Sequence, residues 1–213
     1  GWRGDEHIVS PKEKIEADEF TKFEGSKAKA LGIENMAEAC VQGRGVLVDL
    51  EKRHGRDRVL VGYEELMRIL EEDNIEIEQG DMACFHTGFA QGLMDMNKNP
   101  NEHDLHNTFA CLDGRDEKLQ DWIRDSGIAV IIADNYGIED VSSPLPTGTN
   151  PIAMLPLHEL CIFKLGIHIG EMFYLTPLRD WLRKNKRNRF LLTAPPLRLP
   201  GAVGSPPSPI ATV

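Results

Sequence analysis

The chain has 213 residues, of which 41% are hydrophobic, enough to bury a substantial core in one large domain or a small pair. Its formal net charge of −10 argues against general binding to nucleic acid, because the phosphate backbone would be repelled. No stretch approaches the roughly 18 apolar residues of a membrane helix, so no membrane partner is expected.

Strands and helices alternate along the first half of the chain. Residues 1–40 are charged and weakly patterned, and we expect a surface segment that is incomplete at its start, because no methionine opens it. GVLVDL (45–50) predicts a strand, YEELMRILEED (63–73) an amphipathic helix and MACFH (82–86) a second strand. Residues 91–116 form a long polar connection, which is typical of a lid or a binding loop.

The same alternation continues in the second half. The predicted elements are a helix closed by glycine (117–127), a buried strand (128–134), a helix, glycine stop and strand (156–172), a helix capped by Thr176 (176–185) and a last strand (189–194). Strands that alternate with helices predict an α/β domain over residues 41–213, with helices covering its sheet.

The C-terminal residues 195–213 are rich in proline, glycine and serine, yet apolar side chains recur throughout them. A disordered tail would be more polar, so we predict an ordered, extended arm. An exposed apolar arm gains from a covering surface, and either the chain's own domain or a second copy of the chain would provide one.

Cysteine usage indicates a reducing compartment. The four cysteines are widely spaced and form no CxxC pair, and Cys84 and Cys161 lie in apolar runs. We expect these two to be small core residues in a cytoplasmic protein.

The segment PLHELCIFKLGIHIGEM (156–172) carries the first candidate chemistry. It places His158 near a helix start and Glu171 near the end of the following strand, and these two positions can lie side by side. Imidazole and carboxylate together would make half of a Zn or Mn site. Alternatively, His158 is a partly exposed residue at a helix start and Glu171 an unrelated acid.

Two loops that follow strands carry further candidates. DNYGIED (134–140) follows the most apolar strand, which favours Asp134 and Asn135 as substrate-binding residues at the rim of a pocket. Asp134 could instead only cap a turn. His86 ends a strand in FHTG (85–88), a position that suits a pocket wall and equally suits a turn. No glycine-rich phosphate loop and no GxSxG elbow is present.

Several of these stretches occur in a specific order. GRGVLVDL, GYEELMRIL, GDMACFHTGFA, IAVIIADNYGIE, PLHEL…GIHIGEMFYL and RFLLTAPPLRLPGAVGSPPSPIA follow one another. Together they resemble the metal-dependent cyclase family of hydrolases, which includes bacterial kynurenine formamidases and isatin hydrolases, from about Gly43 to the C-terminus. The resemblance implies a mixed central sheet with flanking helices in a swivelling β/β/α-like architecture, and a link to tryptophan catabolism.

The resemblance also implies roles for single residues. His158 and Glu171 match the histidine and the glutamate that bind a divalent metal in the family. The family's N-terminal HxGTHxDxPxH signature is absent, and the nearest match is GWRGDEH (1–7), whose WxGxxH frame places His7 at the catalytic position. In that frame Arg3 stands where a bridging aspartate is expected, and an arginine cannot ligate a cation.

Two hypotheses follow from the resemblance and from the absence of the family's N-terminal signature. The first is a hydrolase with a Zn or Mn cofactor that cleaves a C–N bond of a small-molecule amide, formamide (arylformamidase-like) or cyclic amide, with His7 as proton shuttle. The second is a non-catalytic relative, a pseudoenzyme that binds a ligand or a protein. The resemblance further implies a homodimer or homotetramer with the C-terminal arm near the interface.

Overall fold

The computed structural model describes residues 28–141 and 153–213. The chain divides into two compact units, one of residues 1–42 and 192–210 and the other of residues 43–191 and 211–213. Most of the C-terminal arm therefore belongs to the same unit as the N-terminal segment. Every described candidate residue of the site lies in the larger unit.

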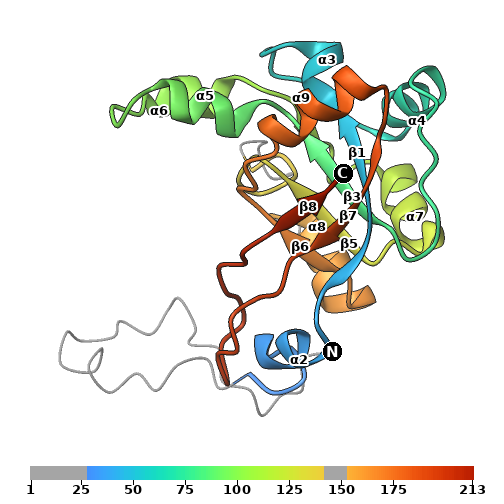
Figure 1. Ribbon diagram of the computed structural model, residues 1–213, viewed down its shortest axis with the longest axis vertical. Helices are drawn as coiled ribbons and strands as arrows, with labels where there is room; N and C mark the ends of the chain where they lie inside the picture. The colour runs from blue at the N-terminus through green and yellow to red at the C-terminus, as the bar shows by residue number, and fades with distance from the viewer. Residues whose placement is uncertain (1–27, 142–152) are drawn as a thin grey trace, which may run out of the picture. The chain divides into compact units, whose positions relative to one another are not determined.

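A six-stranded sheet in the order β6-β5-β3-β1-β7-β8 forms the centre of the fold (Figure 1). Its strands are β1 (Gln42–Asp49), β3 (Met82–His86), β5 (Val130–Ala133), β6 (His168–Gly170), β7 (Arg189–Thr193) and β8 (Ile210–Thr212). The pairs β1–β3, β3–β5 and β5–β6 are parallel, and Val48 lies opposite Phe85, which lies opposite Ala133. The predicted α/β class with a mixed central sheet and flanking helices is confirmed.

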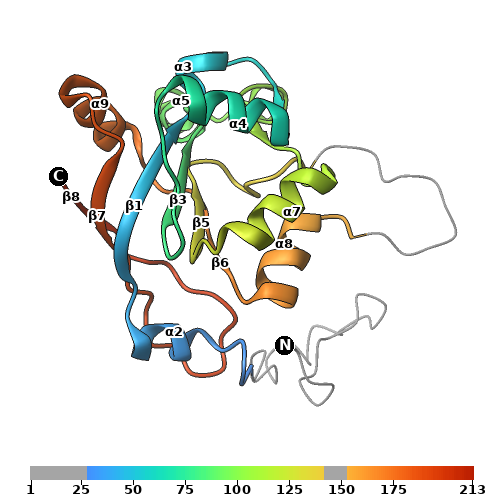
Figure 2. The same ribbon diagram turned by 90° about the vertical axis from the view of Figure 1, so that its right-hand side faces the viewer.

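Helices connect the parallel strands. They are α3 (Leu50–His54), α4 (Tyr63–Glu72), α5 (Phe89–Asp95), α6 (Glu102–Asn107), α7 (Glu117–Ser126), α8 (Pro156–His158) with the π-helix η1 (Glu159–Leu165), and α9 (Thr176–Asn185). Figure 2 shows α4, α7 and α8 on one side of the strands and α9 on the other. Two short strands, β2 (Leu60–Val61) and β4 (Cys111–Leu112), pair separately in parallel. In the described residues no helix combines the length and the apolar character needed to cross a membrane.

The core lies between the sheet and these helices. All residues of β3 and β5 are buried, as expected for central parallel strands that are covered on both faces. Helix α4 contributes Leu66 and Ile69 to this core, α7 contributes Leu119, and α8 contributes Leu157. Cys84 and Cys161 are buried, as predicted, and burial raises the pKa of both thiols to about 12.

Two local predictions are wrong. Residues 91–116 are not an unstructured connection, because they contain the end of α5, all of α6 and β4. Helix α6 has only six residues, too few for an apolar period, and the Asn101 side chain caps it by accepting from the Asp104 amide. Thr176 is the first residue of α9 and not its cap, which is Leu175.

The arm runs as an extended segment that ends in β8. Within the smaller unit, Pro196 and Pro207 form an antiparallel bridge, and the amide of Ile33 in α2 (Ile33–Ala39) donates to the Ala202 carbonyl at 2.8 Å. The Leu197 and Val203 side chains nevertheless remain 51% and 57% exposed. The arm thus carries apolar surface that the described residues leave open.

Candidate active site

The carboxyl ends of three neighbouring parallel strands bring charged groups together. Asp49 ends β1, His86 ends β3 and Asp134 follows β5. One ligand atom from each of Asp49, Glu51 and His86 lies within 4.8 Å of the others. The His86 Nδ1 atom is 3.2 Å from Asp49 Oδ1 and 3.9 Å from Glu51 Oε2. These three donor types suit a divalent cation.

Two arginines of α9 already neutralise these carboxylates. Arg179 pairs with Glu51, and Arg183 Nε lies 2.5 Å from Asp49 Oδ2. Burial alone would raise the pKa of Asp49, but hydrogen bonds from His86 and Arg183 outweigh it and lower the pKa to about 2. A cation here would meet two guanidinium groups, so this cluster fits a metal less well than its ligand types suggest.

The Asp134 side chain links the end of β5 to the residues that follow β3 by hydrogen bonds. Its fully buried carboxylate accepts hydrogen bonds from the Thr87 amide at 2.6 Å, the Thr87 hydroxyl at 2.7 Å and the Gly88 amide at 2.9 Å. Gly88, the cap residue before α5, has a φ of 86°, a left-handed conformation that favours glycine. His86 is also fully buried, with Nε2 3.4 Å from the Thr176 hydroxyl. Substrate binding by Asp134 and His86 stays a prediction.

The segment 156–172 forms a second cluster, in which His158 lies on α8 and Glu171 follows β6. His158 Nε2 lies 3.2 Å from Glu171 Oε1, so the structure brings together the two groups that the sequence predicts as metal ligands. His158 Nδ1 lies 2.9 Å from Glu139 Oε1. The hydrogen bond with Glu139, followed by that with Glu171, raises the pKa of His158 to about 9 against the effect of burial.

Glu139 is a site residue that the sequence reasoning missed. Its carboxylate is buried and accepts from the backbone amides of Leu157 at 2.9 Å and His158 at 3.0 Å. It also bonds to Nδ1 of the His158 ring, whereas Glu171 bonds to Nε2 of the same ring. The loop DNYGIED carries candidate residues, but nothing in its residue pattern indicates which later segment its last acids contact.

The ligand types of the His158 cluster suit a divalent cation, and a bound cation would displace the proton that Nε2 donates to Glu171. Metal-bound histidines commonly donate their second ring N–H to a carboxylate, and Glu139 occupies that position here. Among the described ion pairs, neither Glu139 nor Glu171 is paired with an arginine or lysine. His158 and Glu171 would supply two of the four ligands of a typical zinc site.

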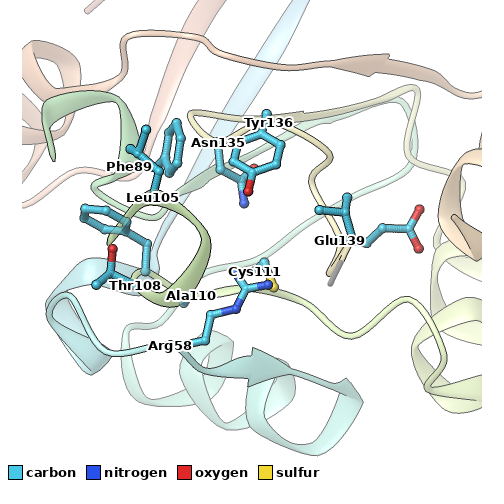
Figure 3. A pocket seen from close by; sticks show the side chains of 11 residues that line it. Arg58, Phe89, Leu105, Thr108, Ala110, Cys111, Asn135, Tyr136 and Glu139 are labelled. Carbon is cyan, nitrogen blue, oxygen red and sulfur yellow. The ribbon is translucent and has the colours of Figure 1, made fainter. Parts of the chain in front are cut away.

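A pocket opens beside this cluster (Figure 3). It is lined by Arg58, Phe89, Leu105, Thr108, Phe109, Ala110, Cys111, Asn135, Tyr136, Glu139 and Val141. The Phe89 ring packs edge-on against Tyr136 at 5.2 Å and against Phe109 at 5.6 Å between centroids. Asn135 is 4% exposed, and its Oδ1 atom has no hydrogen-bond partner in the described structure. The pocket therefore offers aromatic faces and one unpaired buried acceptor.

The predicted catalytic residue His7 lies outside the described residues, as does the rest of GWRGDEH. Its role and the meaning of Arg3 stay predictions. Asn135 lines the pocket, whereas Asp134, predicted at the same rim, is enclosed between strand ends and is not one of the lining residues. The sequence-predicted residues thus fall into separate groups: His158 and Glu171 are in direct contact, His86 lies in the arginine-bound cluster, and Asp134 lies beside it, with Oδ2 3.8 Å from His86 Nε2.

Comparisons with known proteins agree with this architecture. A solved structure described as a novel cyclase is 29% identical, with a TM-score of 0.71 over 85% of this chain and 57% of that chain. One described as a potential metal-dependent hydrolase with cyclase activity is 18% identical, with a TM-score of 0.50 over 80% and 64%. Isatin hydrolase A from Ralstonia solanacearum is 16% identical, with a TM-score of 0.59 over 84% and 63%.

These solved structures are longer than this chain, which aligns to between 57% and 64% of their length. The two relationships below 25% identity show a common fold alone. A comparison with curated protein sequences gave no significant match.

A family model described as "Putative cyclase" matches residues 8–140. The match begins before Gly43, where the resemblance was expected to start, and ends before His158 and Glu171. It nevertheless covers more than half of the 213 residues. The predicted relationship is confirmed, and the chain belongs to the family described as "Putative cyclase".

Proposed function

We propose that the chain belongs to a metal-dependent hydrolase that cleaves a C–N bond of an amide, formamide or cyclic amide. The observation that carries the proposal is the placement of His158 between Glu139 and Glu171. Family membership supports it, as do structural neighbours described as a metal-dependent hydrolase and as isatin hydrolases. The free buried thiols support a reducing, cytoplasmic setting.

The residues would divide the work as follows. A Zn or Mn ion, when bound, would polarise the substrate carbonyl and acidify a water molecule. His158 Nε2 and Glu171 would hold the ion, Glu139 would orient the imidazole, and His7 would move the proton. Further ligands have to come from water or from residues outside the described part of the chain.

A planar substrate would enter this pocket only if its aromatic side chains moved apart, because the space between them holds little more than one water molecule. Phe89, Phe109 and Tyr136 present aromatic side chains, and the unpaired Asn135 Oδ1 can accept a hydrogen bond from a substrate N–H. An arylformamide offers both a ring and an N–H. We therefore assign Asn135 to substrate binding, in a pocket whose wall includes Glu139.

Asn135→Ala tests this assignment. We expect about a tenfold rise in KM for formanilide, because one hydrogen bond of about 1 to 1.5 kcal/mol is lost. The melting temperature should change little, since the buried Oδ1 is unpaired in the described structure. Asn185→Ala, which removes an exposed donor at the end of α9, is the matched control. Lower stability with an unchanged KM would make Asn135 only a turn former.

The decisive experiment for function is a substrate screen of the chain with added Zn²⁺ or Mn²⁺. N-formylkynurenine, isatin, formanilide and a cyclic imide cover the bond types proposed. We expect turnover of at least one, dependent on metal and abolished by His158→Ala. Stoichiometric metal without turnover of any substrate would refute the catalytic proposal, and absence of bound metal would refute the metal centre.

A non-catalytic relative is the second candidate. Arg3 in the GWRGDEH frame favours it, as do Arg179 and Arg183, which occupy the Asp49–Glu51–His86 cluster where a cation could otherwise sit. Ligand binding in the pocket without any hydrolysis would be its signature.

We also propose a closed homo-oligomer, a homodimer or homotetramer. The exposed Leu197, Leu199 and Val203 of the arm support it, since apolar side chains gain from being covered. Light scattering of the full chain at micromolar concentration should give at least the mass of a dimer, and deletion of residues 201–213 should weaken the assembly. A monomeric full chain would contradict the proposal.

A further inference from the structure

The loop before Glu139 has an unfavourable backbone. Ile138 has a φ of 55°, a left-handed conformation that is rare for a β-branched residue, and Gly137 before it has a φ of 82°. Two hydrogen bonds hold this loop on β4: the Leu112 amide donates to the Ile138 carbonyl at 3.0 Å, and the Asp140 amide donates to the Leu112 carbonyl at 3.1 Å. The Ile138 side chain is 1% exposed, so core packing also holds the loop.

Gly114 has no side chain, and the Glu139 carboxylate occupies the space beside it. A Cβ atom built at Gly114 would lie 1.8 Å from Glu139 Oε2, a distance that no real Cβ tolerates. Its φ is not in the left-handed region, so space and not backbone freedom requires glycine here. The loop and Gly114 together fix the position of the Glu139 carboxylate.

Three donors then use the two oxygens of this carboxylate. Oε2 accepts from the Leu157 amide, and Oε1 accepts from both the amide and the ring Nδ1 of His158. Since backbone amides only donate, Glu139 acts as the acceptor, and His158 keeps a proton on Nδ1. The other ring nitrogen, Nε2, is thereby directed toward Glu171. Figure 3 shows the Glu139 carboxylate directed away from the aromatic rings of the pocket.

We propose that Glu139 is a positioning residue that fixes the tautomer and orientation of His158, so that Nε2 and Glu171 face one cation. The inference rests on the proposed function, because only a metal-binding His158 needs a fixed orientation. The hydrogen bonds between Glu139 and His158, however, do not depend on any reaction. Outer partners of metal-bound histidines typically change metal affinity 10- to 100-fold, so the effect is measurable.

Two variants test the proposal in the full chain. Glu139→Gln removes the charge and one acceptor, and Gly114→Ala pushes the carboxylate from its place without touching His158 or Glu171. Gly204→Ala is the matched control, because an added Cβ there meets no atom within 4 Å. Zn²⁺ affinity is measured by calorimetry. The His158 Nδ1–H signal is measured by NMR of ¹⁵N-histidine-labelled protein and assigned with His158→Ala.

We expect both test variants to bind Zn²⁺ about 10- to 100-fold more weakly and to lose or shift the Nδ1–H signal, and the control to change neither. Folded variants with wild-type affinity and an unchanged signal would overturn the proposal, as would a wild-type chain without the Nδ1–H signal. If the wild-type chain binds no Zn²⁺, the proposed function fails, while the signal still decides whether Glu139 fixes His158. If Glu139→Gln fails to fold, the Zn²⁺ affinity and the Nδ1–H signal of Gly114→Ala, which is the smaller change, decide the question.

Discussion

Replacing His158 with alanine is expected to weaken binding of Zn²⁺ or Mn²⁺ on the order of 100-fold, because a ligand should matter at least as much as an outer partner. Glu171→Gln should act similarly. The fold should persist in both variants, since both side chains are partly exposed, at 24% and 35%. Calorimetric titration at fixed pH measures the affinity, and thermal unfolding followed by circular dichroism measures the stability.

The control for this result is His54→Ala. His54 Nε2 also lies 3.1 Å from a glutamate oxygen, Glu65 Oε1, but within the described residues no second carboxylate pairs with its ring. Its loss should leave metal affinity unchanged. Because two ligands of one ion act together, the double variant should be little worse than either single one. Additive losses would argue against a common site, and loss of binding only in His86→Ala would place the ion at the Asp49–Glu51–His86 cluster.

Arg179→Met is expected to reduce the free energy of unfolding by about 3 to 5 kcal/mol, because it leaves the largely buried Glu51 carboxylate without its partner. The Arg179 and Glu51 side chains are 8% and 18% exposed. Urea unfolding measures the difference. Arg183→Met should cost less, since the Arg183 side chain is 42% exposed and Asp49 keeps its contact with His86.

A second variant separates charge from packing. Adding Glu51→Met to Arg179→Met removes the uncompensated carboxylate and should recover part of the lost stability. A double variant as unstable as the single one would show that the methylene packing of Arg179 matters more than its charge. Zn²⁺ that stabilises Arg179→Met but not the wild type would show that the arginine excludes a cation from this cluster.

The elements that the sequence predicts best are those with a local pattern. The run MACF before His86 is apolar because β3 is buried on both faces, and YEELMRILEE places Leu66, Ile69 and Leu70 on one side of α4. The segment around His158 was predictable for a similar reason. Gly166 ends η1 at a φ of 72°, the left-handed stop that its position implies, and the following strand carries the chain to Glu171.

Contacts between segments that are distant in the chain have no corresponding pattern in the sequence. Glu139 meets His158 through a loop whose direction depends on the φ of Ile138 and on hydrogen bonds to Leu112. Arg179 meets Glu51 because side chains of α9 reach the residues at the end of β1, as Arg183 also does to Asp49. Periodicity describes which face of an element is buried, and it contains no information about which side chain of another element lies there.

The parallel order of the sheet also has a consequence for how the chain folds. Gly45 pairs with Met82 and Met82 with Val130, so each pairing joins segments that are far apart in the chain. Closing such loops costs entropy before the strand contacts compensate for it, which slows folding. Helices α4 and α7 can form from local contacts, whereas the meeting of Asp49, His86 and Asp134 requires three aligned strands. We therefore expect the contacts among Asp49, His86 and Asp134 to be among the last to form during folding.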